Sequence, residues 1–282
     1  MVADSKPDVH DESVRHLVEL GYFDPDEVSA AEVARRRRHE TDLGHAVTFL
    51  GQGDGREAVT RLERIVADDP TWTSPRQLLA EAQYRTGNWL ESRVHLDWLE
   101  HHGVVTPKLA TIAGAMALAR RDLTRALDEL TYAAHVESTL VGVHALLGST
   151  LLRLGRHEAA KTAFEQAIQR DASDVQALDG LAAVALRCGD FEGAAHWALE
   201  ALEHDMQQFR AHYHLGVALI HLGQPDAAAE AFATCARLAP TRAAPFYWLS
   251  RVAAGQGNAA RTTEYREQAR AIVRQRRGLT ST

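Results

Sequence analysis

A residue pattern that returns every 34 positions constrains the fold of this chain more than any other feature of its sequence. Small residues keep the eighth and twentieth places of seven consecutive units, which run from 39 to 276 without insertion or deletion. Within the units, apolar residues recur three or four positions apart, which places them on one face of a helix. Each unit therefore predicts two short amphipathic helices that pack on each other and then on their neighbours.

Three columns of the repeat have a direct physical meaning. Small residues at the eighth and twentieth places let two helices cross closely. Glycine at the fifteenth place can adopt positive φ and end the first helix, and Arg121 in the third unit is the one exception. Leucine at the seventh place is predicted to lie in the core. The columns are, for the eighth place, Ala46, Ala80, Gly114, Gly148, Ala182, Gly216 and Ser250; for the twentieth, Ala58, Ser92, Ala126, Ala160, Ala194, Ala228 and Thr262; for the fifteenth, Gly53, Gly87, Arg121, Gly155, Gly189, Gly223 and Gly257; and for the seventh, Leu79, Leu147, Leu181, Leu215 and Leu249.

The units resemble the tetratricopeptide repeat, a 34-residue helix–turn–helix whose signature has Leu-Gly followed by Ala, Phe and Pro at fixed offsets. The resemblance covers 39–276 and is strongest over 107–276. The matching residues are Leu147-Gly148, Ala160 and Phe164 in one unit, and Leu215-Gly216, Ala228, Phe232 and Pro240 in another. A generic helical bundle would have no reason to keep a fixed period.

The expected fold is all-α: a right-handed α-solenoid, or superhelix, of seven helix–turn–helix repeats with an N-terminal helical cap. Residues 1–38 are expected to hold a disordered start followed by the capping helices, of which the second runs from Pro25 to about Leu50. A frayed tail is expected over 277–282. The seven expected repeats are 39–72, 73–106, 107–140, 141–174, 175–208, 209–242 and 243–276.

Composition and charge narrow the classes of partner. Hydrophobic residues make up 45% and charged residues 24% of the 282 residues, which is ordinary for a soluble globular chain. The net charge of −7 does not favour binding to nucleic acid or to anionic membranes. No apolar run approaches the ~20 residues that span a bilayer, and the N-terminus lacks the apolar core of a signal peptide. Cys188 and Cys235 are predicted to be small packed hydrophobes. A cytoplasmic protein fits these features.

The sequence carries no recognisable catalytic or metal-binding motif. It has no Gly-rich phosphate loop, no CxxC pair, no HExxH and no GxSxG. The histidine pairs are badly spaced for one metal ion: His212 and His214 point about 200° apart on a helix, and His214 and His221 are about 10 Å apart. We therefore expect no enzyme activity, no cofactor and no metal site.

The resemblance implies that the first helix of each unit lines a concave wall through its second, fifth, ninth, twelfth and thirteenth places. These places hold the acidic Glu40, Glu81 and Asp179, together with Tyr84. They also hold a larger basic and aromatic set, which predicts a mildly basic, tyrosine-bearing groove inside an acidic protein. The predicted groove residues are Arg85, Lys108, Arg153, Arg187, Arg210, Tyr213, His221, Tyr247 and Arg251.

The leading interpretation is a non-enzymatic protein–protein interaction scaffold that holds a peptide, acidic or phosphorylated, in this groove. The alternative rests on LVELGYFDP at 17–25, which is similar to the junction before the repeats of some bacterial alkaline-phosphatase-superfamily hydrolases and implies a regulatory or targeting module. A third possibility is a self-associating structural protein. The chain has only two asparagines, Asn88 and Asn258, so the Lys/Arg/Asn carboxylate clamp of cochaperone relatives is absent.

Overall fold

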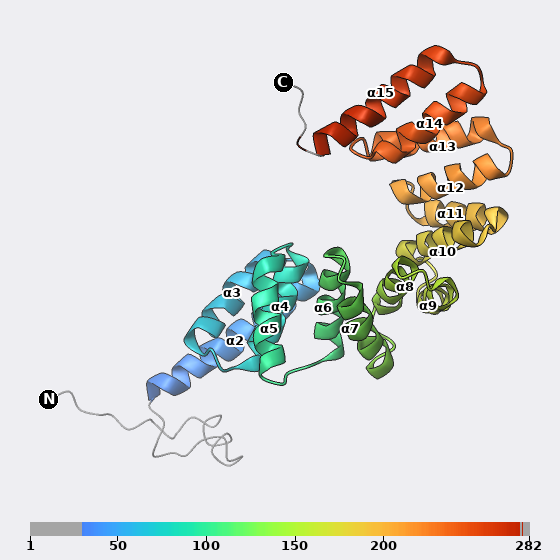
Figure 1. Ribbon diagram of the computed structural model, residues 1–282. Helices are drawn as coiled ribbons and strands as arrows, with labels where there is room; N and C mark the ends of the chain where they lie inside the picture. The colour runs from blue at the N-terminus through green and yellow to red at the C-terminus, as the bar shows by residue number, and fades with distance from the viewer. Residues whose placement is uncertain (1–29, 277, 279–282) are drawn as a thin grey trace. The chain divides into compact units, whose positions relative to one another are not determined.

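The computed structural model describes residues 30–276 and 278, and every regular element in that part of the chain is an α-helix (Figure 1). The chain divides into two compact units, one reaching to Ala113 and the other beginning at Gly114, so the boundary falls inside helix α6. Our expectations for a disordered start, for the first capping helix and for the segment at 17–25 lie outside the described residues.

The helices follow one another as hairpins in both units. The first unit contains α2 (Ala30–Gln52), α3 (Gly55–Asp68), α4 (Thr73–Arg85), α5 (Trp89–His101) and the first half of α6 (Pro107–Ala119). The second unit continues α6 and contains α7 (Leu123–Val136), α8 (Val143–Arg153), α9 (His157–Arg170), α10 (Val175–Cys188), α11 (Phe191–His204), α12 (Phe209–His221), α13 (Pro225–Leu238), α14 (Ala243–Gly255) and α15 (Ala259–Arg276).

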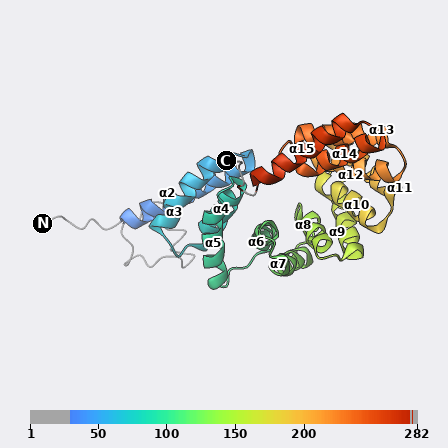
Figure 2. The ribbon, with the colours of Figure 1, turned by 45° about the horizontal axis from the view of Figure 1, so that its top comes forward.

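The second unit is a helical solenoid when it is considered by itself. Each first helix packs on the helix that follows it, and α10 also contacts α8 on one side and α12 on the other. Figures 1 and 2 show the hairpins from α10 to α15 stacked in chain order. The expected all-α solenoid of helical repeats is therefore confirmed, whereas the number of tetratricopeptide repeats stays a prediction.

The second expected capping helix continues into the repeats without a break. Helix α2 begins at Ala30 and ends at Gln52, across the position where the first repeat was expected to begin. Its start at Pro25 lies outside the described residues. The next helix begins after a turn in which Gly53 adopts a φ of +84° and Asp54 accepts a hydrogen bond from the N–H of Glu57.

Left-handed backbone ends the first helix of each hairpin, as the fifteenth column predicts. Glycine supplies this conformation at little cost because it has no Cβ. In the third hairpin Arg121 adopts it instead, with a φ of +65°, and it is the only non-glycine residue with positive φ in the described chain. Arg121 therefore keeps the turn while carrying a steric cost that its counterparts avoid. The glycines in this column are Gly53, Gly87, Gly155, Gly189, Gly223 and Gly257.

Aromatic rings occupy the space that the small residues leave at the helix crossings. A Cβ placed on Gly148 would stand 2.7 Å from the ring of Phe164, and one on Gly216 would stand 2.7 Å from the ring of Phe232. Both rings are fully buried. Gly180, from the following hairpin, meets the Phe164 ring on another side, so this phenylalanine joins two successive hairpins.

We predict that Gly216→Ala destabilises the protein by about 1–3 kcal/mol, because the added methyl group must displace the Phe232 ring in a packed core. Gly255→Ala is the matched control, since nothing lies within 4 Å of a Cβ at Gly255 and its φ is not positive. The control should be neutral or slightly stabilising. Chemical denaturation followed by circular dichroism measures both, and equal effects of the two variants would show that the crossing is not tight.

The seventh column is buried less completely than the sequence predicts. Leu79, Leu181 and Leu249 lie in the core, but Leu147 and Leu215 are only partly buried. Leu147 packs at the edge of the cluster around Phe164, and Leu215 at the edge of the cluster around Leu178. Leu147 and Leu215 therefore lie at the edge of the core, whereas the sequence predicts that they lie in it.

A polar side chain at the fourth place closes the loop before its helix in three hairpins. Arg76 donates from Nη2 to the carbonyl of Pro70 at 2.7 Å. His144 and His212 bind the carbonyls of Ser138 and Met206 through Nε2, each at 3.0 Å. In all three the acceptor lies six residues earlier. Burial lowers the pKa of His144, which favours the neutral ring that can donate from Nε2. These histidines therefore have structural partners.

Candidate peptide-binding groove

Three cavities lie along the inner helices of the second unit. We call them the arginine pocket (about 620 Å³), the middle pocket (about 400 Å³) and the aromatic pocket (about 920 Å³). The arginine and middle pockets share Leu152, Arg153 and Arg187, and the middle and aromatic pockets share Tyr213 and Trp248. Neighbouring cavities share wall residues, so the three follow one another from the α6–α7 turn to helix α15, and together we call them the groove.

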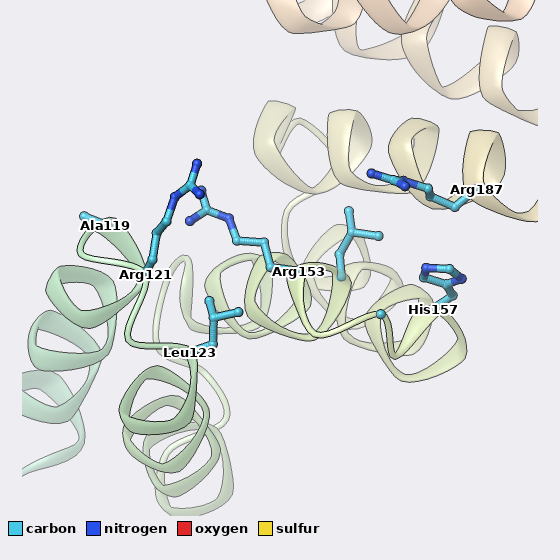
Figure 3. Close-up of a pocket in the computed structure, with 8 residues that line it drawn as sticks. Ala119, Arg121, Leu123, Arg153, His157 and Arg187 are labelled. Atoms are coloured by element: carbon cyan, nitrogen blue, oxygen red, sulfur yellow. The ribbon is translucent and has the colours of Figure 1, made fainter. Parts of the chain in front are cut away.

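The arginine pocket collects cations from three successive hairpins (Figure 3). Arg121 comes from the α6–α7 turn, Arg153 from the end of α8, and Arg187 from the end of α10, while His157 comes from the start of α9. Among the residues that the structure describes, the side chain of neither Arg121 nor Arg187 has a hydrogen-bond or ion-pair partner. The rest of its wall consists of Ala119, Leu123, Leu152 and Gly155, so no acidic residue lines it.

Arginine at the thirteenth place has a structural role that the sequence did not reveal. Arg153 donates from Nη1 to the carbonyl of Leu118 at 2.9 Å, and Arg85 donates in the same way to Leu50 at 3.1 Å. Each acceptor lies near the C-terminal end of the preceding first helix, where carbonyl groups lack helical partners. Arg153 therefore ties two hairpins together in addition to lining the cavities.

Two buried carboxylates neutralise three of the predicted groove cations. Glu81 binds Arg85 Nη2 and Lys108 Nζ, both at 2.7 Å, in the first unit. In the second unit, Asp179 binds Arg210 Nε at 2.9 Å and His214 Nδ1 at 2.7 Å. The sequence placed Glu81 and Asp179 on the groove wall but did not pair them. In the arginine pocket, the side chains of Arg121 and Arg187 have no such partner among the described residues, and in the aromatic pocket the same holds for Arg270 and Arg274.

The aromatic pocket lies at the other end of the groove. Trp248 donates from Nε1 to the hydroxyl of Tyr213 at 3.2 Å and stacks against the buried ring of Phe232, with the ring centroids 5.7 Å apart. The guanidinium group of Arg251 also lies over the Trp248 ring, 4.7 Å from its centre. Tyr247 keeps 56% of its surface exposed. The pocket thus offers a rigid aromatic wall, and Arg270 and Arg274 of α15 line it as well.

The structure brings five of the nine predicted residues to this groove. Arg153, Arg187, Arg210 and Tyr213 line the middle pocket, and Tyr213 and Tyr247 line the aromatic pocket. Arg85 and Lys108 belong to the first unit. The remaining two lie beside aromatic rings: Arg251 over Trp248, and His221 stacked on Phe191 with the ring centroids 4.0 Å apart.

Sequence reasoning missed Arg121, His157, Trp248, Arg270 and Arg274. Arg121 lies in a turn and His157 begins a second helix, so neither occupies a first-helix groove place. The break in the glycine column at Arg121 was the one signal that could have drawn attention to the arginine pocket. Trp248 adjoins the predicted Tyr247, and no column marks it.

The two cysteines have different environments. Cys235 is buried in α13, as the sequence predicts, whereas Cys188 is exposed at the end of α10, where the prediction of packing is wrong. Its position in the last turn of the helix, just before Gly189, lifts it away from the core. Burial raises the pKa of the Cys235 thiol to about 11. Only Cys188 is therefore accessible to reagents in the folded chain.

We predict that a disulfide reagent at about pH 8 titrates one thiol of the native protein quickly and the second only after denaturant is added, because the thiolate is the reactive species. Cys188→Ser should remove the fast phase, and Cys235→Ser should leave it intact. Absorbance of the released thiol measures both phases. Fast reaction of both cysteines in the native protein would contradict the burial of Cys235.

No group of three or more His, Cys, Asp or Glu side chains within the described residues is placed to hold a metal ion. None of their helices combines the length and the apolar character that crossing a bilayer requires.

Comparison with known proteins gives the same fold. Two family models described as tetratricopeptide repeat match residues 146–209 and 209–242. A tetratricopeptide repeat protein from Parabacteroides merdae has a similar structure, with 13% identity, a TM-score of 0.60, and coverage of 84% of this chain and 93% of its own. A MamA structure is 16% identical, with a TM-score of 0.51, and the match covers 62% of this chain and 96% of the MamA chain. A MamA double mutant is 20% identical, with a TM-score of 0.52, and the match covers 60% of this chain and 96% of the mutant chain. No curated protein matches the chain.

Proposed function

We propose that this chain, which carries tetratricopeptide repeats over residues 146–242, is a protein-interaction scaffold that holds an extended segment of a partner protein in the groove of its second unit. The observation that carries the proposal is that the three pockets follow one another and share the wall residues Leu152, Arg153, Arg187, Tyr213 and Trp248. A linear ligand can contact such a groove at several places at once.

The chemistry of the groove supports a ligand with two different ends. The arginine pocket suits an anionic group, because guanidinium groups donate parallel hydrogen bonds to carboxylates and phosphates. The aromatic pocket suits a large apolar or aromatic side chain, since Tyr247 and Trp248 offer flat surface at low entropic cost. The ligand we propose is therefore a segment that carries negative charge near one end and an apolar anchor near the other.

A displayed library of random peptides, selected against the full-length chain, tests this proposal. We expect the selected peptides to combine acidic residues with an aromatic or large aliphatic residue. In fluorescence anisotropy, Arg187→Glu and Tyr247→Ala should each weaken a selected peptide by about tenfold or more, because both side chains line the groove and neither is part of the core.

The matched control is Lys161→Glu, which makes the same charge change in α9 on a side chain that lines none of the three pockets. It should bind the selected peptides as the unmodified chain does. Circular dichroism of all variants checks that folding is retained. If peptides bind the two groove variants and the control equally well, the partner uses another surface, and the proposal is wrong.

A further inference from the structure

Arg121 occupies a backbone position that a glycine would occupy at lower energy. In the other six hairpins the same turn position is glycine, whereas Arg121 holds a φ of +65° with a full side chain. Left-handed backbone is costly for residues with a Cβ, and such outliers often mark sites where the side chain has a use. The fold does not need an arginine here, because glycine makes this turn elsewhere in the same chain.

The strained residue lines a pocket whose wall also includes Arg153, Arg187 and His157 (Figure 3). Gathering Arg121, Arg153 and Arg187 around one cavity raises the electrostatic energy of the free protein, and an anion between them would lower it. Asp122, next to Arg121, accepts from the N–H of Arg125, and Asp190, three residues after Arg187, accepts from the N–H of Gly193; neither lines the pocket.

One of the three arginines is held in place before any ligand binds. The hydrogen bond from Arg153 Nη1 to the carbonyl of Leu118 fixes one edge of its guanidinium group and leaves its other N–H groups for the pocket. Such preorganisation lowers the entropic cost of binding. The side chains of Arg121 and Arg187, which have no partner within the described residues, supply the remaining donors, and His157 lines the same cavity.

We propose that Arg121, Arg153, Arg187 and His157 form a subsite for a phosphate group, carried on a phosphorylated side chain of the segment bound in the groove. The inference rests on the proposed function for the identity of the carrier, but not for the anion itself. A phosphate monoester has nearly two negative charges and three acceptor oxygens, which matches several guanidinium forks better than one carboxylate does. The cavity of about 620 Å³ has room for the phosphate together with the side chain that carries it.

The first test uses inorganic phosphate as the probe, at constant ionic strength, with binding to the full-length chain followed by phosphorus NMR. We expect saturable binding to the unmodified chain and at least about fivefold weaker binding to Arg121→Gly and to Arg187→Gln. Lys161→Gln, which removes a charge outside the pocket, should bind phosphate normally. Absence of saturable binding, or equal binding by all four proteins, would overturn the subsite.

Arg121→Gly also separates a binding role from a structural one. Because glycine relaxes the left-handed turn, this variant should melt at a temperature at least as high as that of the unmodified chain while it binds phosphate less well. A purely structural arginine would instead lower the melting temperature on removal. A lower melting temperature together with unchanged phosphate binding would therefore contradict the inference.

The second test identifies the carrier. A groove peptide from the library is synthesised with serine, glutamate or phosphoserine at its acidic position, and we expect the phosphoserine form to bind most tightly and to lose that advantage in Arg121→Gly.

If inorganic phosphate binds but phosphoserine gives no advantage, a free anion is the ligand and the phosphorylated segment is excluded. If peptides bind through Tyr247 without any dependence on phosphate or Arg121, the groove stands and the phosphate subsite is wrong. If phosphate binds and no peptide does, the proposed function fails and the anion site alone remains.

Discussion

Replacing Phe164 with alanine should destabilise the second unit by about 3–5 kcal/mol. The ring is fully buried and touches Gly148 of its own hairpin and Gly180 of the next. Its loss leaves a cavity that neither glycine has a side chain to fill. Because repeat proteins are stabilised mainly by contacts between neighbouring repeats, the damage should reach both hairpins.

Chemical denaturation measures this effect, with Phe191→Ala as the matched control. Phe191 is only partly buried and stacks on the exposed ring of His221, so its removal opens no closed cavity. We expect the control to cost clearly less than Phe164→Ala. If the two variants unfold at the same denaturant concentration, Phe164 does not join the two hairpins in the way its contacts indicate.

Replacing Asp179 with alanine should cost about 2–3 kcal/mol, the second of the large effects. The carboxylate is 3% exposed and binds both Arg210 and His214. The cost stays below that of a fully buried pair, because Arg210 is 54% exposed and water can hydrate its charge when the partner is lost. Removal of the carboxylate also leaves the groove more positive, so an anionic groove peptide should bind this variant at least as tightly.

Arg210→Ala provides the comparison for Asp179→Ala. The carboxylate keeps its hydrogen bond from His214 in that variant, and the lost partner is a surface group, so the expected cost is below about 1 kcal/mol. Thermal unfolding of both variants at neutral pH measures the difference. A larger loss for Arg210→Ala than for Asp179→Ala would reverse our assignment of the buried carboxylate as the centre of this cluster.

The sequence predicted the features that depend on local spacing. Glycine at the fifteenth place and small residues at the eighth place follow from steric rules that act within one hairpin, and the structure has left-handed turns and tight crossings at those positions. Burial at the seventh place was harder to predict. Whether Leu147 reaches the centre of a cluster depends on how much space Phe164 fills.

Charge pairing between hairpins could not be read from the columns. Glu81 pairs with Lys108, and Asp179 pairs with Arg210, across two helices. The spacing of residues within one repeat does not show whether side chains of different helices reach each other. The bond from Arg153 to the carbonyl of Leu118 involves a backbone group that no sequence pattern displays. The groove residues stay a prediction, and only the structure shows which of their cations have partners.

Photocrosslinking of a bound peptide tests the central claim most directly. A library-selected peptide is made in two forms, one with a photoreactive group beside its apolar anchor and one with the group beside its acidic end, and the crosslinked residues of the full-length chain are found by mass spectrometry. We predict that the first form labels the aromatic pocket around Tyr213, Tyr247 and Trp248, and that the second labels the arginine pocket around Arg121 and Arg187. Crosslinks confined to the second helices α9, α11 and α13, or to the first unit, would contradict the claim that the groove of the second unit holds the partner.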